Sequence, residues 1–271
     1  MNVRWGDSQL VSAQWSAESL DAMVASVAVA CAGVDAVLRG HRRGGGGAGE
    51  SPLNAVCIVR PPGQHARFSH ARGMCILNNT AIAAAYARIS HGCRRILVID
   101  LDPHHGDGTL EFLTRLELAG TEPASASSVA DAGSPLEKVE AVVRMSSNEA
   151  VAEIKDLSMS LISFHTPGLQ PQPDAGHLAM RPNATLIPTN AMESSSEEIV
   201  RTMDRLRPEL VLLSLGYGPE HHDRQPQLMS SIATAAAAHG CPVLSIMEGG
   251  FDPRVQVQVF ADHVRALGKP V

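Results

Sequence analysis

Five short apolar runs constrain the fold of this chain more than any other feature of its sequence. Each run is too short for a helix and contains β-branched residues, so each is predicted to be a buried strand. The runs are residues 55–59, 95–99, 159–163, 209–214 and 242–247. Helical patterns separate most of them, at residues 16–39, 76–91, 194–207, 227–239 and 254–267. This alternation predicts a doubly wound α/β fold, in which helices cover both faces of a mostly parallel sheet.

The composition of the 271-residue chain agrees with such a core. Hydrophobic residues make up 44% of the sequence, yet Phe, Trp and Tyr together number nine. An aliphatic core of this kind suits a parallel sheet that is buried on both faces. The formal net charge of −6 at pH 7 argues against direct nucleic-acid binding through a basic face.

Cysteine usage and the N-terminal sequence indicate an intracellular protein of the cytoplasm or nucleus. The five cysteines are odd in number and show no CxxC spacing, which argues against a disulfide scaffold. The first residues, MNVRWGDSQL, lack the basic and apolar regions of a signal peptide. The longest apolar stretch, residues 22–34, is too short to span a bilayer. We therefore expect it to form a buried helix, and we expect no membrane partner.

Two segments interrupt the alternation of strands and helices. Residues 40–52 are rich in glycine and are predicted to form a flexible loop. Residues 114–157 are predicted to be an insertion, because they contain a polar tract of low complexity at 119–135. The alternation resumes after each segment, so residues 1–271 are expected to form one domain.

Polar residues and glycines follow every predicted strand. In open parallel sheets, binding and catalytic sites form beyond the carboxyl ends of the strands. The five groups of residues are Gln64 and His65, Asp100–Gly108, Ser163–His165, Ser214–Gly218 and Glu248–Phe251. The sequence therefore predicts that these groups meet at one edge of the sheet.

The strongest local signal is the cluster of acids and histidines after the second predicted strand. Asp102 and His104 are separated by one residue, so their side chains share a face of an extended chain. One carboxylate and one imidazole make half of a site for zinc or another divalent metal. Asp100 could serve a second cation or orient a ligand. The alternative is a loop whose acids only cap the next helix, which is the role we expect for Asp107.

Other strand ends carry candidates that also have ordinary explanations. His65 lies in a loop stiffened by prolines and is either a general base or a surface histidine. Gly249 and Gly250 permit close approach to a ligand or simply a tight turn. His221 and His222 lie either in solvent or beside the metal.

Six phrases in sequence order resemble the histone deacetylase superfamily, and most of all its class II-like and acetylpolyamine amidohydrolase branch. They are RPPGQHA (60–66), GMCILNNTAIAAAYA (73–87), ILVIDLDPHHGDGT (96–109), ISFH (162–165), ELVLLSLGYG (209–218) and MEGGF (247–251). The resemblance extends from about Asp7 to near the C-terminus, apart from residues 114–157. It implies an arginase-like α/β fold of three layers and the zinc-dependent removal of acetyl groups from lysine side chains or polyamines.

The resemblance also implies roles for individual residues. Asp102 and His104 correspond to the first two zinc ligands, and His65 corresponds to the second histidine of a proton-handling pair. The family's structural potassium site corresponds to Asp100, Ser163 and Phe164. His105 corresponds to a buried neighbour of the metal ligand.

Three positions that carry the chemistry of the family are changed in this chain. The third zinc ligand corresponds to Gly218, the first histidine of the pair to Gln64, and the catalytic tyrosine to Phe251. Glycine has no side chain to bind a metal, glutamine cannot titrate, and phenylalanine lacks the hydroxyl donor. Losing one such donor typically costs about 10²–10³ in turnover, and a missing ligand weakens metal affinity. His221 and His222 follow Gly218 closely enough to be candidate substitute ligands.

Two functions follow from this combination of retained and changed residues. The first is an amidohydrolase of impaired activity, with Zn²⁺ and K⁺ as cofactors and an acetylated lysine or acetylated amine as substrate. The second is an inactive deacetylase-like pseudoenzyme that serves as a scaffold for a protein partner. Family domains also begin with a strand and a helix that have no counterpart here. This leaves open a fragment without a stable fold, a piece of a longer sequence, or a reduced domain whose sheet exposes an edge.

Overall fold

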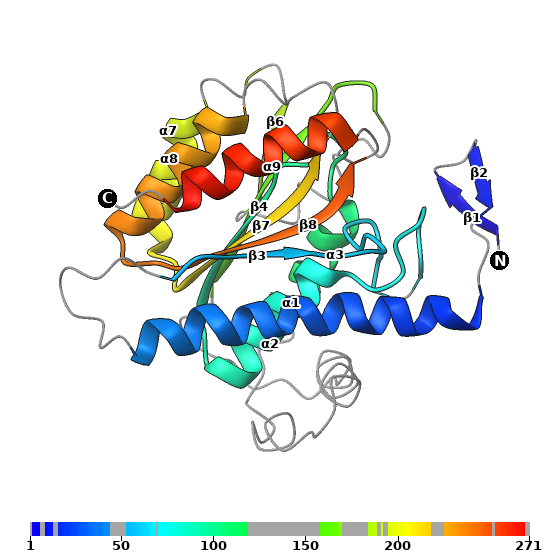
Figure 1. Ribbon diagram of the computed structural model, residues 1–271, viewed down its shortest axis with the longest axis horizontal. Helices are drawn as coiled ribbons and strands as arrows, with labels where there is room; N and C mark the ends of the chain where they lie inside the picture. The colour runs from blue at the N-terminus through cyan, green and yellow to red at the C-terminus, as the bar shows by residue number, and fades with distance from the viewer. Residues whose placement is uncertain are drawn as a thin grey trace.

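A six-stranded parallel sheet forms the centre of the molecule (Figure 1). The computed structural model describes residues 2–5, 9–12, 16–43, 53–68, 70–118, 158–169, 184–188, 191, 195–217, 225–250 and 253–268. The strand order is β3-β8-β7-β4-β5-β6, and every neighbouring pair is parallel. The strands are β3 (Ala55–Ile58), β4 (Arg95–Asp100), β5 (Ser158–His165), β6 (Ala184–Pro188), β7 (Leu210–Tyr217) and β8 (Val243–Gly250). The predicted α/β fold is confirmed.

Helices cover both faces of this sheet, as Figure 1 shows. One layer contains α1 (Ala17–Arg43), α2 (Asn79–His91) and α3 (Asp107–Leu118). The other contains α7 (Ser195–Leu206), α8 (Gln225–Ala238) and α9 (Pro253–Leu267). Successive residues of a strand point to opposite faces. In β4, Ile96 and Val98 therefore join the first core, and Leu97 and Ile99 join the second. This explains why the strands are apolar throughout.

Two predicted segments overlap these helices at their ends. Residues 40–43 belong to α1, so this end of the predicted loop is helical, and residues 114–118 of the predicted insertion belong to α3. Leu110 and Leu113 are buried one turn apart, and this apolar face continues the helical pattern into the range assigned to the insertion. The rest of both segments, 44–52 and 119–157, lies outside the described residues.

A separate antiparallel hairpin precedes α1. Its strands are β1 (Asn2–Trp5) and β2 (Gln9–Ser12), which form a two-stranded sheet of their own. The hairpin was not predicted, because its runs are short and partly polar.

Helix α1 is longer than the apolar stretch that predicted it. Its segment Glu18–Arg39 is long and apolar enough to cross a membrane, with a mean hydropathy of 1.8. However, Val27 and Val34 are completely buried in the core that α1 shares with α2 and the sheet. The prediction of a helix packed into the core is confirmed for this face. The predicted helical range 16–39 agrees with α1 except at its C-terminal end, which extends to Arg43.

Candidate active site

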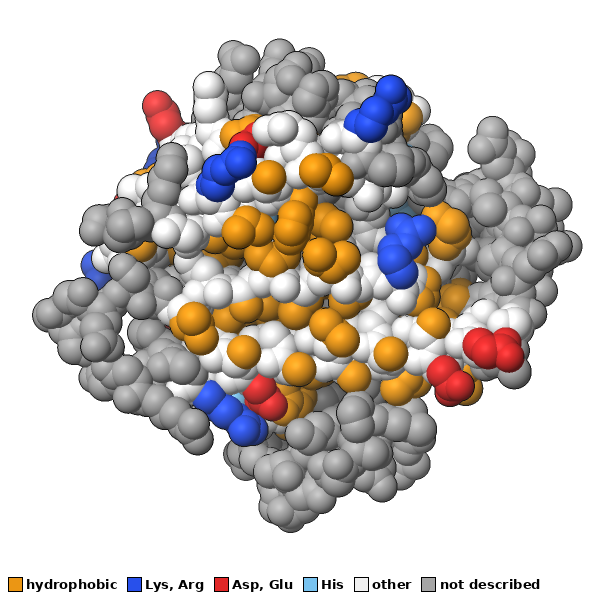
Figure 2. Space-filling view, viewed as in Figure 1, with side chains coloured by type: hydrophobic (Ala, Val, Ile, Leu, Met, Phe, Trp, Pro, Cys, Tyr) orange, Lys and Arg blue, Asp and Glu red, His pale blue; other side chains and the backbone are white. Residues whose placement is uncertain are grey.

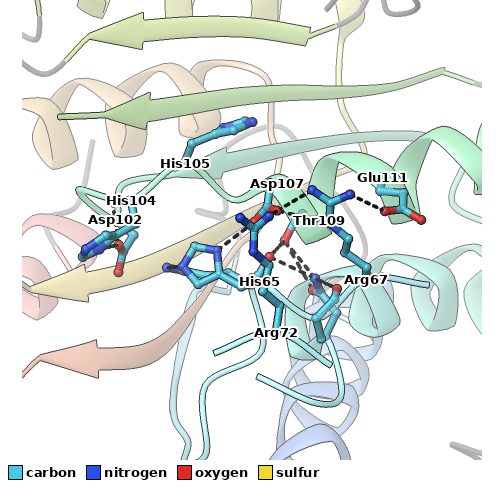
Figure 3. Close-up of polar contacts among 12 residues, drawn as sticks. His65, Arg67, Arg72, Asp102, His104, His105, Asp107, Thr109 and Glu111 are labelled. Atoms are coloured by element: carbon cyan, nitrogen blue, oxygen red, sulfur yellow. Dashed lines mark hydrogen bonds and ion pairs between the residues drawn. The ribbon is translucent and has the colours of Figure 1, made fainter. Parts of the chain in front are cut away.

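The carboxyl ends of the central strands meet at one edge of the sheet. Asp100, the last residue of β4, is in register with Ser163 on β5 and with Ser214 on β7. The loops that follow β3 and β4 carry His65 and Asp102, and the other labelled residues of Figure 3 lie in these loops or at the start of α3. The described members of the five predicted groups are therefore brought together.

His65 and Asp107 form a buried dyad. The distance from His65 Nδ1 to Asp107 Oδ1 is 2.9 Å, and both side chains are buried. A carboxylate only accepts hydrogen bonds, so we assign the proton of neutral His65 to Nδ1 and the lone pair to Nε2. The side-chain amide of Gln64 lies 3.4 Å from Nε2, where it can donate. His65 is thus arranged as a group that can take up a proton.

Two arginines bind the same aspartate (Figure 3). Arg67 donates to Asp107 Oδ2 through Nε at 3.2 Å and through Nη2 at 2.9 Å, and Arg72 forms an ion pair with the same oxygen. Burial alone would raise the pKa of Asp107, but the hydrogen bond and charge of His65 and the charge of Arg72 lower it to about 2. Asp107 is therefore an anion at neutral pH.

The role predicted for Asp107 is wrong. Asp107 does begin α3, as a capping acid would, but its carboxylate turns toward His65 and the two arginines. The sequence signal that could have indicated this role is the position of Asp107 in the cluster of acids and histidines after the second predicted strand. An acid at the start of a helix is ordinarily explained by the helix itself, which hid this role.

Asp102 and His104 form a second pair beside the dyad. Asp102 Oδ1 accepts a hydrogen bond from the His104 backbone at 2.8 Å and lies 2.9 Å from His104 Nδ1. The rings of His65 and His104 are perpendicular, with centroids 6.1 Å apart. Burial favours a higher pKa for Asp102, but the hydrogen bonds and charge of His104 lower it below its usual value.

These residues do not complete a zinc site within the described part of the chain. Catalytic zinc usually takes three protein ligands, and Asp102 and His104 supply two. No group of three or more His, Cys, Asp or Glu residues among the described ones could hold a metal ion. Gly218, the expected third position, and the candidate substitutes His221 and His222 lie outside those residues. The pair also interacts with itself, so we derive no chemical step through zinc.

The surroundings of Asp100 suit a buried cation better than those of the Asp102–His104 pair suit zinc. Asp100 is completely buried, and its Oδ1 accepts a hydrogen bond from the Asp102 backbone at 3.1 Å. Its Oδ2 has no hydrogen-bond partner among the described residues. Burial, and then the charge of Asp102, raise the pKa of Asp100 well above its usual value. A buried carboxylate in this state needs either a proton or a cation.

Ser163, which is expected at the potassium site, is in register with Asp100 on the neighbouring strand. His105 is buried, and its Nδ1 lies 2.9 Å from Ser163 Oγ. The same hydroxyl lies 3.4 Å from the carbonyl oxygen of Phe164. Asp100, Ser163 and Phe164 therefore offer oxygen atoms from two adjacent strands, which is the donor chemistry of a hard cation.

Glu248 supports the loop that carries Gln64 and His65. Its Oε2 accepts hydrogen bonds from the backbone of Gly63 at 2.7 Å and of Gln64 at 3.1 Å. Burial raises the pKa of Glu248 to about 7. This support was not predicted, because it joins two segments that are far apart in sequence.

The glycines after Glu248 have different surroundings. Gly250 has a φ of 127°, which favours glycine, and the next residue, Phe251, lies outside the described residues. Gly249 packs against the backbone of Gly216, opposite Asp102. Its place beside the carboxylate agrees with a close approach of backbone to the site.

Residues 6–123 match the model of the histone deacetylase domain family. Polyamine deacetylase HDAC10 of Homo sapiens is 48% identical over 75 residues, which are 28% of this chain and 10% of that protein. Histone deacetylase 14, chloroplastic, of Arabidopsis thaliana is 28% identical over 227 residues, which cover 80% of this chain and 47% of that protein. The predicted resemblance to the histone deacetylase superfamily is confirmed.

Two solved deacetylase-fold structures agree with this assignment. The HDA15 HD domain superposes with a TM-score of 0.63 at 19% identity, over 92% of this chain and 64% of that one. An acetylpolyamine aminohydrolase from Burkholderia pseudomallei gives a TM-score of 0.53 at 20% identity, over 88% and 61%. The predicted arginase/deacetylase-like fold is thus confirmed. The chain spans less than half the length of the curated deacetylases named here.

Proposed function

We propose that this chain acts on acetylated lysine or another acetylated amine and hydrolyses the amide with impaired activity. The observation that carries the proposal is the His65–Asp107 dyad beside the Asp102–His104 pair. The polyamine deacetylase and the histone deacetylases among its relatives support this substrate class.

In this proposal His65 is the group that handles the proton. Its Nε2 takes the proton of the attacking water, and Asp107 stabilises the imidazolium that results. Arg67 and Arg72 keep Asp107 ionised throughout. The Gln64 side chain is held beside His65 by hydrogen bonds, but an amide cannot take up or release a proton. One proton-handling side chain therefore remains where the family has two histidines. This loss, with those at Gly218 and Phe251, is the reason we expect low turnover.

The test compares hydrolysis of an acetyl-lysine peptide and an acetylated polyamine by the purified chain and its variants. We expect His65→Ala and Asp107→Asn each to lower the rate at least about 100-fold. Arg205→Ala, on the last turn of α7, is the control and should leave the rate unchanged. If the wild type hydrolyses the substrate and both dyad variants retain that rate, the proposal would be overturned.

Metal analysis of the same preparations tests the zinc half-site. The proposal assigns Asp102 and His104 as ligands of any zinc that the chain retains, with the remaining ligands from outside the described residues. Asp102→Asn should then lower the zinc content measured by elemental analysis. Equal zinc in the wild type and the variant would remove Asp102 from that role.

We also propose that K⁺ neutralises Asp100, because its buried Oδ2 lacks a hydrogen bond among the described residues. Exchanging K⁺ for a bulky organic cation should then lower the melting temperature. Asp100→Asn should abolish this dependence on K⁺. A wild-type melting temperature that does not depend on K⁺ would contradict the assignment.

The second candidate is an inactive protein that binds the same class of ligand or a protein partner. The surroundings of Gln64 favour it, because its Oε1 accepts from Ser214 at 3.3 Å while its amide lies against His65. The Gln64 amide thus contacts both His65 and Ser214, but it cannot take up or release a proton. Binding of an acetyl-lysine peptide by calorimetry, without turnover, would select this candidate. In either case we propose an intracellular location, since all five cysteines are free and buried.

A further inference from the structure

A cavity of about 350 Å³ lies at the end of the sheet opposite the candidate active site. Arg95, which lines it, is the first residue of β4, and Arg207 and Glu209 line it just before β7 begins. The residues of the candidate active site follow the carboxyl ends of the same strands. Sites for small molecules have volumes from about 300 Å³ upward, so this cavity is large enough for a small ligand.

Arg207 has a backbone conformation that is unfavourable for an arginine. Its φ is 47°, and it is the only residue other than glycine with a positive φ in the described part of the chain. It follows α7 directly, and its backbone N–H donates to the Met203 carbonyl oxygen at 2.7 Å. Helices that end in this way usually have glycine at this position, as α2 has at Gly92. Backbone strain of this kind is common at functional sites.

Arg95 is held against Arg207. Arg95 Nε donates to the Arg207 carbonyl oxygen at 2.8 Å, and Arg95 Nη2 lies 3.5 Å from Glu209 Oε1. The Arg207 side chain forms no ion pair with any residue that the structure describes. Two arginines thus lie in one wall of the cavity, and the charge of Arg207 is not neutralised there.

The carboxylates nearest the cavity already accept hydrogen bonds. Glu209 Oε2 accepts from two backbone N–H groups at the start of β4, at 2.7 and 3.0 Å. Asp204 Oδ1 lies 3.0 Å from His239 Nε2. Asp35 Oδ1 lies 2.7 Å from His91 Nε2. Guanidinium groups only donate hydrogen bonds, so the cavity needs an acceptor more than it needs a donor.

The helix ends at the cavity do not need the arginines as caps. The carbonyl ends of α2 and α8 carry partial negative charge, which favours nearby cations. The backbone N–H of Gly92 donates to the carbonyl oxygens of Ala87 and Arg88. The backbone N–H of Gly240 donates to the Ala237 carbonyl oxygen at 2.9 Å. Because backbone groups already bind these carbonyls, the two arginines remain available to a ligand.

The surroundings of the cavity are basic although the whole chain is acidic. Two arginines and one glutamate line the cavity, whereas the chain has a formal net charge of −6. Arg94, next to Arg95, is exposed and adds a further positive charge. A local positive potential of this kind attracts anions.

We propose that this cavity binds the phosphate group of a small molecule, with Arg95 and Arg207 as its ligands. Paired N–H donors make guanidinium groups well suited to phosphate. A phosphate group carries about two negative charges on one centre, so a single group can neutralise both arginines. The cavity is larger than a phosphate ion, which leaves room for the rest of a phosphate monoester. The proposal is independent of whether the strand-end site hydrolyses amides.

Calorimetric titration of the full chain with inorganic phosphate, at an ionic strength held constant with NaCl, tests the proposal. We expect saturable binding to the wild type. Arg207→Gln removes one guanidinium group and should raise the dissociation constant at least about 10-fold. Arg205→Gln is the matched control, because Arg205 is exposed, lies two residues earlier and does not line the cavity. No binding at about 10 mM phosphate, or equal effects of both variants, would overturn the proposal.

Arg207→Gly separates ligand binding from the stability of the fold. Glycine adopts a φ of 47° easily, so without phosphate this variant should melt no lower than the wild type. Phosphate should raise the melting temperature of the wild type, because a ligand of the folded state stabilises it. The rise should be much smaller in Arg207→Gly. An equal rise in both proteins would overturn the role of Arg207.

A titration with glycerol 3-phosphate distinguishes the two sources of the phosphate group. Binding that is tighter than that of inorganic phosphate would assign a phosphate monoester as the ligand. Equal or weaker binding would assign the free ion. In either case Arg207→Gln should weaken the binding, and an unchanged affinity for both compounds would overturn the proposal.

Discussion

At the scale of single residues, the space around Asp102 depends on a glycine in the neighbouring strand. A Cβ atom on Gly216 would lie 1.5 Å from Asp102 Oδ2, so no side chain fits there unless the carboxylate moves. A Cβ atom on Gly249 would lie 3.8 Å from the same oxygen, which is an ordinary contact. The two glycines border one carboxylate, but only Gly216 is required by its position.

We expect Gly216→Ala to lower the free energy of unfolding by about 1–3 kcal/mol, because the new methyl group forces Asp102 out of place. Gly249→Ala should cost less than about 1 kcal/mol, since its methyl group meets no close atom. Urea denaturation of both variants measures the difference. Equal losses would show that the crowding at Gly216 does not decide the geometry of the site.

The buried Glu248 should make stability depend on pH. Its pKa is raised by burial to about 7 from an ordinary value of 4.5. The folded protein therefore binds this proton more tightly than the unfolded chain does. Its contribution to stability is complete below about pH 4.5 and is lost as the pH rises through about 7. Asp107, with a pKa lowered to about 2, acts in a separate window below pH 3.8.

We expect the free energy of unfolding of the wild type to carry a Glu248 contribution that falls by up to about 3 kcal/mol between pH 4.5 and 7.5. Glu248→Gln cannot titrate and should remove this slope. Glu197→Gln, at an exposed position on α7, should retain it. Urea denaturation across this pH range measures the slopes. Parallel curves for wild type and Glu248→Gln would contradict the role of burial.

At the scale of elements, one asparagine joins the start of α2 to the site. Asn78 Oδ1 accepts a hydrogen bond from the Ala81 backbone at 2.9 Å and so caps the helix. Its Nδ2 donates to Thr109 Oγ1 at 3.1 Å and to the Ala66 carbonyl at 3.2 Å. The same side chain thus fixes α2, α3 and the loop that follows His65.

We expect Asn78→Ala to lower the free energy of unfolding by about 2–3 kcal/mol, because it removes both the cap and the donors to buried acceptors. Asn78→Ser keeps a capping oxygen and should cost about half as much. Thermal and urea unfolding of the two variants provide the comparison. A serine variant as unstable as the alanine variant would assign the whole effect to the donors.

The strands were predictable at this scale because each central one is buried on both faces. The predicted runs 95–99 and 242–247 correspond to β4 (Arg95–Asp100) and β8 (Val243–Gly250), which both continue beyond the C-terminal end of the run. β6 was missed, because its five residues include Thr185 and end at Pro188, so the run is short and partly polar. Helix α3 was not among the predicted helical ranges, although Asp107 was expected to cap a helix that follows it.

The site was predictable where its residues are local in sequence. Asp102 and His104 lie two residues apart, and their pairing follows from that spacing. The dyad between His65 and Asp107, and the support from Glu248, join segments that only the tertiary fold brings together. No local pattern distinguishes such an acid from one that caps a helix.

At the scale of the whole molecule, the sheet separates two cores and leaves one edge apolar. Among the described strands, β3 is last in the order and pairs with β8 alone. The α1 and α9 layers both present apolar residues toward that edge (Figure 2). The candidate active site thus lies at the carboxyl ends of the strands, whereas these apolar residues lie at the side of the sheet.

The contact between Glu248 and the loop at Gly63 spans 185 residues of sequence. During synthesis the ribosome releases the His65 loop long before it releases the carboxylate that supports it. The first half of the chain therefore emerges with β3 lacking its neighbour β8, and long-range pairings of this kind close slowly. We expect the nascent chain to depend on chaperones over this interval, and the active geometry to arise only after β8 has left the exit tunnel.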